Sequence, residues 1–424
     1  MAQATVGIVI TGTEVLTARI TDRNGPWLSE RLRELGFDLQ HITICRDRPR
    51  DIRAQLEFMA SSGVDLVCTT GGLGPTADDL TTAVVAEFCG RQLFLDEPLH
   101  EKIREIQRPY AERFDWDVEA LDAGALKQAY VPTGAVVLGP AGTAPGLVVP
   151  PAPGLDRPTV VVLPGPPREL REIWAEAIGT GLFKELARRT VVFEEQMLRM
   201  IGVPEPEIAK SLRAFDEAEG LGSLEITTCL RGGEMEILIS HDPAERARRD
   251  KLVAVFKAQY GEAIFSEDGE TIEQQVIRLL AGRRLALAES CTGGLLAKRM
   301  TDADGASAFF TGSAVTYSDQ AKAEVLGVDG SLIERVGAVS EEVAREMAAG
   351  ALRVYDAEFA VSTTGIAGPT GGSEEKPVGT VYINASARAG RERAVHIVLP
   401  GGRQDVRERT TTVALHALRA LLTE

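Results

Sequence analysis

The sequence has few cysteines, few histidines, no long apolar run and fewer basic than acidic residues. Its five cysteines are odd in number and lie far apart, mostly in apolar stretches, which is typical of reduced intracellular thiols and indicates no disulfides. The 46 Lys and Arg residues against 62 Asp and Glu residues give a formal net charge of −16. Such a charge repels nucleic acid unless basic residues cluster, and we find no basic cluster. We therefore expect no direct nucleic-acid contact.

Membrane segments are also missing from the sequence. No apolar run reaches the roughly 18 residues that suggest a membrane helix. The N-terminal stretch MAQATVGIVITGTEV has no basic segment and leads directly into a strand-like run, so it is typical of a fold rather than of a signal peptide. We expect a cytoplasmic protein without membrane contact. The length of 424 residues predicts two or three domains.

The first part of the chain alternates short β-branched runs with helical periods over residues 5–90. This βα repetition predicts a parallel, doubly wound sheet with helices on both faces. Residues 96–130 look helical and polar, and two strands separated by loops rich in Pro and Gly follow them. We expect this first domain over residues 1–175, with ligands at the carboxyl ends of its strands.

Two smaller domains are expected after the first. Residues 176–265 contain strands and a short helix with hairpin-like breaks, which predicts an α+β domain without an obvious reactive cluster. The segment SEDGETIEQQVIRLLAGRR then begins with a capping-type start and opens a third domain over residues 266–424. A new αβ pattern runs from residue 283 to a final amphipathic helix. The predicted fold class is therefore α/β, with a small α+β domain in the middle.

A glycine turn at residues 68–81, CTTGGLGPTADDLT, separates a buried strand from a helix. Backbone amides in such a turn can approach phosphate oxygens closely, and Thr76 or Asp78 is available as a helix cap. Asp78 and Asp79 would repel a phosphate unless a divalent cation lay between, so one interpretation is a metal-bridged diphosphate. The alternative is that both aspartates only complement the helix dipole.

Two other loops, TGTEV at 11–15 and LPGPPREL at 163–170, are expected at the same edge of the sheet. Glu14 in the first loop either joins a metal or ribose site or merely begins a helix. The second loop is a Pro-rich turn of a kind that is usually structural.

A second candidate site is centred on LAESCTGG at residues 287–294, where Ser290 ends a strand-like run. The amides that follow, those of Cys291, Thr292, Gly293 and Gly294, would begin a helix and could donate to an oxyanion. None of the five histidines has a partner motif near Ser290, so a Ser-His-Asp triad is poorly supported.

A lysine is the better candidate base for Ser290. In GSAVTYSDQAKAEVLGV, a strand is expected to end at Tyr317 and a short helix to carry Lys322. An apolar surround can lower the pKa of a lysine amine enough for it to take a serine proton. Tyr317 could relay a proton or hold the lysine. Each residue also has a plain structural interpretation, as a helix cap, a solvated helix residue or packing.

Cys291 is a competing nucleophile on the evidence of the residues alone. A thiolate at a helix N-terminus is activated by the helix dipole. A buried cysteine in an intracellular protein is, however, usually inert packing. Sequence spacing leaves both interpretations open.

A long loop, TTGIAGPTGGSEEKPVGT at residues 363–380, offers backbone donors that suit a nucleotide phosphate, or is simply a flexible surface loop. Arg403 or Arg407, in PGGRQDVR, could pair with that phosphate, although a solvated helix arginine is the alternative. The candidate phosphate-binding residues here are Thr364, Gly365, Gly368, Arg403 and Arg407.

The motifs of the first domain, TGTE, DRN at 22–24, TTGGLGPTADD, GTAPG at 142–146 and PGPPREL, resemble the molybdopterin-binding fold in the order found in the CinA family of competence/damage-inducible proteins. That resemblance implies metal-dependent hydrolysis of ADP-ribose, with Mg or another divalent ion at Asp78 and Asp79. The nucleotide contacts that it implies are Gly12, Glu14, Asn24, Gly71, Gly72, Gly74, Thr76, Pro164 and Gly165.

The motifs of the third domain, AESCTGG, GSAVTYSDQAK, GAVSEEVAREMAAGAL, STTGIAGPTGGSEEKPVGTV and PGGRQDVRERT, resemble the C-terminal CinA domain, which also exists alone as nicotinamide-mononucleotide amidase. The resemblance implies a Ser/Lys amidohydrolase with Ser290 as nucleophile, Lys322 as base and Tyr317 beside them, without a cofactor. It also implies a homodimer.

Two other functions are possible for such a chain. The first domain could only bind a pterin or a nucleotide, and the protein could act in DNA uptake as an interaction protein, as the family name suggests.

Overall fold

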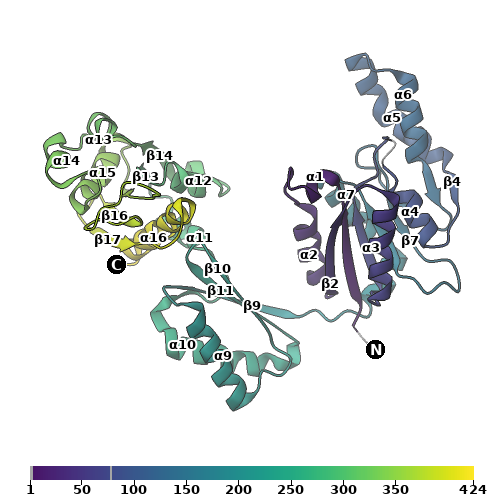
Figure 1. Cartoon of the computed structure of the whole chain (residues 1–424), viewed down its shortest axis with the longest axis horizontal. Coiled ribbons are helices and arrows are strands. Elements are labelled where there is room, and N and C mark those ends of the chain that lie inside the picture. The colour runs from purple at the N-terminus through teal and green to yellow at the C-terminus, as the bar shows by residue number, and fades with distance from the viewer. Residues whose placement is uncertain (1–2, 77–78) are drawn as a thin grey trace. The chain divides into compact units, whose positions relative to one another are not determined.

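The computed structural model describes residues 3–76 and 79–424, and the chain divides into two compact units, Met1–Phe193 and Glu194–Glu424 (Figure 1). The first unit contains a six-stranded sheet. In spatial order its strands are β2 (Asp38–Cys45), β1 (Thr5–Thr11), β3 (Leu66–Thr70), β8 (Thr159–Leu163), β7 (Gly146–Val149) and β6 (Val136–Leu138). The first four strands are parallel to one another, as predicted. Strand β7 pairs antiparallel with β8, and β6 pairs antiparallel with β7. The segment rich in Pro and Gly thus contains three strands rather than two.

Helices cover both faces of this sheet, which confirms the doubly wound fold. Strand β1 places Ile8 and Ile10 in one core and Val9 in the other, because successive strand residues point to opposite faces. On the first face lie α2 (Asn24–Glu34), α7 (Pro167–Ala177) and α8 (Gly181–Ala187). On the second lie α3 (Pro49–Ser61) and α4 (Thr81–Phe88). A short helix, α1 (Thr13–Leu16), follows β1.

The first unit extends beyond the predicted boundary at residue 175, which falls inside α7. Trp174 of α7 and Phe183 of α8 are both buried in the core of this unit, and their rings make an edge-to-face contact at 5.5 Å. The two helices therefore belong to the first sheet, and the unit ends at Phe193.

A helical hairpin is inserted between α4 and the strands at the sheet edge. Helices α5 (Glu97–Phe114) and α6 (Val118–Gln128) match the predicted polar helical segment and project away from the sheet in Figure 1. A two-stranded ribbon of β4 (Leu93–Leu95) and β5 (Tyr130–Pro132) closes their base. The end of α6 is thereby brought to the glycine turn that follows β3.

The second unit begins with a four-stranded antiparallel sheet. In spatial order its strands are β10 (Glu225–Arg231), β11 (Glu234–His241), β9 (Glu194–Ile201) and β12 (Ile264–Ser266). Helices α9 (Glu205–Glu219) and α10 (Arg246–Tyr260) bury Ile208, Phe215 and Phe256 against it. The turns η1 (Pro243–Glu245) and η2 (Gly261–Ala263) flank α10.

A five-stranded sheet follows in the same unit. Its order is β14 (Phe310–Val315), β13 (Leu285–Glu289), β15 (Phe359–Gly365), β16 (Thr380–Ala387) and β17 (Glu392–Val398). On one face lie α11 (Ile272–Leu280), α12 (Leu295–Thr301) and α16 (Arg403–Thr423), and on the other α13 (Asp319–Leu326), α14 (Gly330–Val336) and α15 (Glu341–Val354). The turn η3 (Ala306–Ala308) precedes β14. The three parallel strands β14, β13 and β15 end at one edge.

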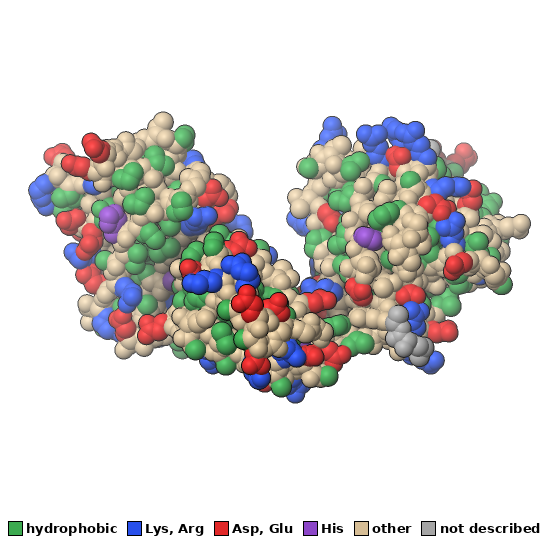
Figure 2. Space-filling view, turned by 60° about the horizontal axis from the view of Figure 1, so that its bottom comes forward, with side chains coloured by type: hydrophobic (Ala, Val, Ile, Leu, Met, Phe, Trp, Pro, Cys, Tyr) green, Lys and Arg blue, Asp and Glu red, His purple; other side chains and the backbone are tan. Residues whose placement is uncertain are grey.

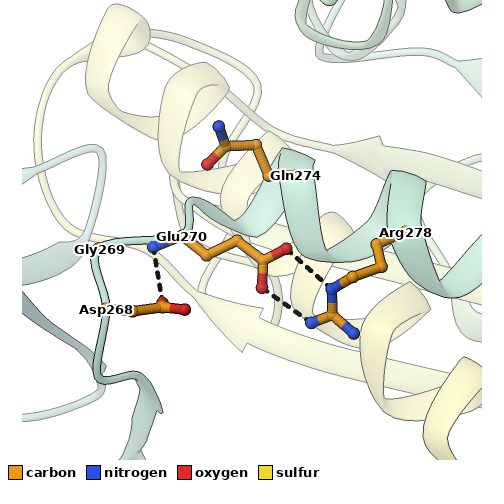
Figure 3. Close-up of a pocket in the computed structure, with 5 residues that line it drawn as sticks. All are labelled: Asp268, Gly269, Glu270, Gln274 and Arg278. Atoms are coloured by element: carbon orange, nitrogen blue, oxygen red, sulfur yellow. Dashed lines mark hydrogen bonds and ion pairs between the residues drawn. The ribbon is translucent and has the colours of Figure 1, made fainter.

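The segment that joins the two sheets of the second unit is held by charged side chains, drawn in Figure 3. Arg278 of α11 donates two hydrogen bonds to Glu270, at 2.9 and 2.8 Å, and the Glu270 N–H donates to Asp268 Oδ1 at 3.1 Å. They border an open hollow of about 740 Å³. Thr271 caps α11 in a capping box with Gln274, in agreement with the predicted capping-type start.

Two observations concern membrane-spanning segments and the charge of the surface. Among the residues that the structure describes, no helix is both long and apolar enough to cross a membrane. On the face drawn in Figure 2, acidic and basic side chains are interspersed over each unit.

Candidate functional site

Ser290 is the first residue after β13 and lies at the edge where the parallel strands end. Its N–H donates to Thr363 O of β15 at 2.9 Å, so the neighbouring strand fixes its backbone. The residue is buried, with 8% of its surface exposed. The helix after it begins at Leu295, four residues later than a helix starting at Cys291 would.

Lys322 reaches Ser290 from α13. Its Nζ lies 3.3 Å from Ser290 Oγ, and the lysine is only 1% exposed. The amine also donates to the main-chain oxygens of Thr316 at 3.1 Å and Tyr317 at 3.5 Å. A neutral amine has two N–H bonds and one lone pair. In the neutral form, with both N–H bonds on these carbonyls, the lone pair is the group left to accept a hydrogen bond from the serine hydroxyl.

Burial lowers the pKa of the Lys322 amine from its ordinary value of 10.5, because the charged ammonium loses its hydration. Asp319, with its carboxylate 3.9 Å from Nζ, opposes part of this shift. A lowered pKa increases the fraction of neutral amine that can accept a proton. Among the described residues, no histidine is bonded to Ser290, in keeping with the absence of a triad motif.

Cys291 has the opposite environment. It is 4% exposed and packs in the hydrophobic core of the five-stranded sheet. Burial raises the pKa of its thiol to about 12, and the charge of Glu289 adds to that shift. Since the thiolate is the nucleophilic form of cysteine, Cys291 is a poor nucleophile near neutral pH. The geometry therefore favours Ser290.

Glu289 is a central residue that the sequence interpretation missed. It is fully buried at the end of β13. Its carboxylate accepts hydrogen bonds from the N–H groups of Gly294 at 2.9 Å, Leu296 at 3.1 Å and Ala297 at 2.8 Å. Ser313 of β14 donates a fourth bond at 3.2 Å. The carboxylate thus occupies the positive end of α12 and holds the turn that carries Ser290. The sequence feature that could have identified Glu289 is a charged residue at the end of an apolar strand.

This carboxylate changes the set of possible oxyanion donors. The N–H of Gly294 is bonded to Glu289, and that of Gly293 donates to Ser290 O at 3.1 Å, so neither is free as predicted. The N–H groups of Cys291 and Thr292 have no backbone or side-chain oxygen partner among the described residues. They remain as the two candidate donors beside Ser290.

Tyr317 and Arg403 meet at the exposed side of the site. Tyr317 is 58% exposed, and its hydroxyl accepts a hydrogen bond from Arg403 Nη2 at 2.8 Å. Arg403 also donates to Gly368 O of the long loop at 2.9 Å, and Arg407 donates to Thr292 O at 2.8 Å. Arg403 and Arg407, both in the first turns of α16, therefore border the site. Lys322 is held by the main-chain oxygen of Tyr317 rather than by its phenol.

Thr364 does not join this group of residues. Its hydroxyl donates to Ala338 O at 2.8 Å and the residue is 1% exposed, so it is not available to a phosphate. The strand alternation explains the difference, because the adjacent Thr363 points to the other face and its hydroxyl lies 2.8 Å from that of Thr292. Gly365, which ends β15, leads into the long loop.

In the first unit, Asn24 joins the predicted loops. Its Nδ2 donates to Thr70 Oγ1 at 2.9 Å and to Gly165 O at 2.7 Å. The Thr70 hydroxyl donates to Pro164 O at 3.0 Å. These bonds bring the ends of β3 and β8 together with the start of α2. Gly12, after β1, donates to Cys45 O at 3.1 Å, and Glu14 lies in the exposed first turn of α1.

The glycine turn is tightly packed. Gly71 and Gly72 have φ angles of 101° and 67°, and a Cβ at Gly71 would lie 2.4 Å from Thr11 O. The N–H of Gly71 is bonded to Leu163 O, whereas those of Gly72 and Gly74 have no hydrogen-bond partner among the described residues. Gly72 and Gly74 are thus the open donors of the turn.

Helix α4 begins only at Thr81, without a side-chain cap, so Thr76 does not cap it as predicted. Asp79 Oδ2 instead accepts hydrogen bonds from the Thr76 N–H at 2.9 Å and hydroxyl at 2.6 Å. Asp78 lies outside the described residues. Within residues 3–76 and 79–424, no group of three His, Cys, Asp or Glu side chains is close enough to hold a metal ion. The described residues therefore do not by themselves form the expected metal site.

Two family models match the two ends of the chain, and relatives are similar to it over nearly its whole length. Residues 269–422 match the CinA C-terminal domain, and residues 7–184 match a probable molybdopterin binding domain. A CinA-like protein of Mycolicibacterium paratuberculosis is 52% identical over 434 residues, covering 99% of each chain. One of Mycobacterium sp. (strain MCS) is 53% identical over 421 residues, again covering 99% of each chain. The solved competence/damage inducible protein CihA of Agrobacterium tumefaciens is 42% identical, with 35% of this chain and 94% of that chain covered and a TM-score of 0.34.

The environment of Lys322 predicts a lowered titration midpoint. In protein labelled with ¹³C at lysine Cε, we expect the Lys322 resonance, assigned by its loss in Lys322→Ala, to titrate below pH 10.5. In urea, where burial is lost, the midpoint of the same residue should return to its ordinary value. A midpoint at or above 10.5 in the folded protein would show that the amine is charged at neutral pH and would remove the base from the site.

Proposed function

Because the chain belongs to the CinA family, we propose that its C-terminal site hydrolyses the carboxamide of nicotinamide mononucleotide to nicotinate mononucleotide and ammonia. The observation that carries this proposal is the 3.3 Å approach of the buried Lys322 amine to the Ser290 hydroxyl. A serine is a weak nucleophile without a base, and a desolvated lysine is one of the groups that can act as one.

The first half of the reaction forms an acyl-enzyme. Lys322 accepts the hydroxyl proton as Ser290 Oγ attacks the carboxamide carbon. The N–H groups of Cys291 and Thr292 stabilise the negative charge that develops on the carbonyl oxygen. Lys322 then gives its proton to the amide nitrogen, the C–N bond breaks, and ammonia leaves an ester on Ser290.

The second half releases the acid. Lys322, neutral again, takes a proton from water, and the hydroxide oxygen attacks the ester carbon. The tetrahedral intermediate collapses, and Lys322 returns the proton to Ser290 Oγ. The same residue thus serves as base and then as acid in each half-reaction. Its lowered pKa increases the fraction of the neutral form that can act as the base.

Recognition of the nucleotide is assigned to the exposed side of this site. Arg403 bridges the phenol of Tyr317 and the loop at Gly368, so a phosphate bound by the loop backbone would lie near a fixed guanidinium. Arg403 is exposed, whereas Arg407 is partly buried and bonded to Thr292 O. We assign the phosphate to Arg403 and a structural role in the Ser290 turn to Arg407.

A second activity, hydrolysis of ADP-ribose to AMP and ribose 5-phosphate, is proposed for the first unit. It is supported by the open N–H groups of Gly72 and Gly74 beside the segments that Asn24 joins. Backbone amides in a glycine turn are suited to phosphate oxygens. The need for a divalent ion remains a prediction, and no step is assigned to one.

Three substitutions test the amidase. With nicotinamide mononucleotide as substrate, Ser290→Ala and Lys322→Ala are expected to lower ammonia release by orders of magnitude, whereas Cys291→Ala keeps most of it. In the wild type, kcat should fall as the pH falls through the lowered pKa of Lys322, because only the neutral amine accepts a proton. Loss of activity in Cys291→Ala alone would reverse the assignment of the nucleophile.

The second activity is tested by AMP formation from ADP-ribose in the presence of Mg²⁺. EDTA should abolish it, and Asp79→Asn should lower it at least about tenfold, as expected for the loss of a charged group at a metal ion that bridges the diphosphate. Asp115→Asn is the matched control, since Asp115 ends α5 in a left-handed conformation that Asn accepts. Ser290→Ala should also retain full AMP formation.

Binding of ADP-ribose without any AMP would instead indicate a binding module. Undiminished hydrolysis in EDTA would contradict the metal requirement.

A further inference from the structure

A cavity of about 230 Å³ lies against the glycine turn of the first unit. One wall is the turn itself, at Gly72, Leu73 and Gly74. The others come from α4, from the end of α6 and from the ribbon of β4 and β5, so the helical hairpin completes it. Apart from the glycine turn and Pro145 of the GTAPG motif, the residues of this cavity belong to no motif of the sequence.

The lining of the cavity is largely apolar. Leu73, Leu80, Leu93 and Pro145 face it, together with the ring of Tyr130. Tyr130 is 42% exposed and Leu93 38% exposed, so two large apolar side chains are left open beside a hollow. Such an arrangement is typical of a surface that a ligand covers.

The polar side chains at the cavity are fixed in place. Gln128 is 7% exposed, and its Nε2 donates to Leu73 O at 2.8 Å, which ties α6 to the glycine turn. Lys127, the preceding residue, donates to Thr76 O on the same turn. These bonds tie the end of α6 to the turn, and Lys127 adds a positive charge to the cavity lining.

We infer that this cavity receives the planar base of the nucleotide whose phosphates lie on the glycine turn, with the base stacked on Tyr130. This inference rests on the ADP-ribose activity proposed above and names the part of the site that selects a nucleotide over a simple sugar phosphate.

Three features of the cavity fit a base. Its volume is below the roughly 300–1,000 Å³ of pockets for drug-sized ligands and suits a single ring system. An exposed tyrosine ring stacks on the face of any base. Gly72 and Gly74, whose N–H groups are open, also line the cavity, so base and phosphate would be bound side by side.

The test compares AMP with ribose 5-phosphate, which differ by the base, by calorimetry on the full chain. Tyr130→Ser should weaken AMP binding about tenfold, the usual loss for one stacked base, and leave ribose 5-phosphate binding unchanged. Ala83→Trp should have the same effect by filling the cavity, since Ala83 is an exposed residue of α4 that lines it. Tyr110→Ser, at an exposed tyrosine of α5 outside the cavity, is the control and should bind AMP normally.

The outcomes separate this inference from the proposed activity. AMP binding that is insensitive to both Tyr130→Ser and Ala83→Trp overturns the base site, whether or not ADP-ribose is hydrolysed. AMP binding that depends on both residues supports the base site even if no hydrolysis occurs, in which case only the proposed activity fails. With hydrolysis present, Tyr130→Ser should raise KM for ADP-ribose about tenfold with little change in kcat, because the base lies away from the bond that breaks.

Discussion

The C-terminal site depends on one lysine amine that is buried against a serine hydroxyl. A buried ammonium is unfavourable, and the protein lowers this cost by lowering the pKa of Lys322 rather than by pairing it closely with an acid. The nearest carboxylate, that of Asp319, is 3.9 Å away on an exposed side chain. The two carbonyl oxygens that accept its N–H bonds direct the remaining lone pair. The proposed chemistry follows from this placement.

Glu289, on the other side of the Ser290 turn, is also buried and ionisable, but its surroundings differ from those of Lys322. Glu289 is as deeply buried as Lys322, yet it is fully hydrogen-bonded, by three backbone N–H groups and a serine hydroxyl. A satisfied carboxylate can remain charged in the interior, where an unsatisfied one could not. It anchors the turn and disfavours the thiolate of Cys291. Glu289 thus holds the turn of Ser290 in place, while Lys322 remains available as the base.

For the first and third predicted domains, the sequence indicated strands, turns and candidate site residues. Ser290 and Lys322 were candidates from their positions at a strand end and in an apolar helix, and the resemblance to the CinA family favoured them over Cys291. The free amides could not be predicted, because Gly294 is bonded to a side chain five residues earlier. Thr364 was wrongly predicted at the site, because it points to the opposite face of β15 from Thr363. Helix α4 starts at Thr81, later than predicted, because Asp79 accepts hydrogen bonds from Thr76 instead of capping a helix. Hydrogen bonds between a side chain and the backbone, whether local or tertiary, are not encoded in the periodicity of a sequence.

The account is tested most directly by trapping the covalent intermediate. Protein mixed with nicotinamide mononucleotide and quenched in acid within the first turnover should give a peptide that carries the nicotinate mononucleotide acyl group as an ester on Ser290, and Lys322→Ala should give none. Turnover without any adduct, or an adduct on Cys291, would contradict the serine and lysine pair as the source of the reaction.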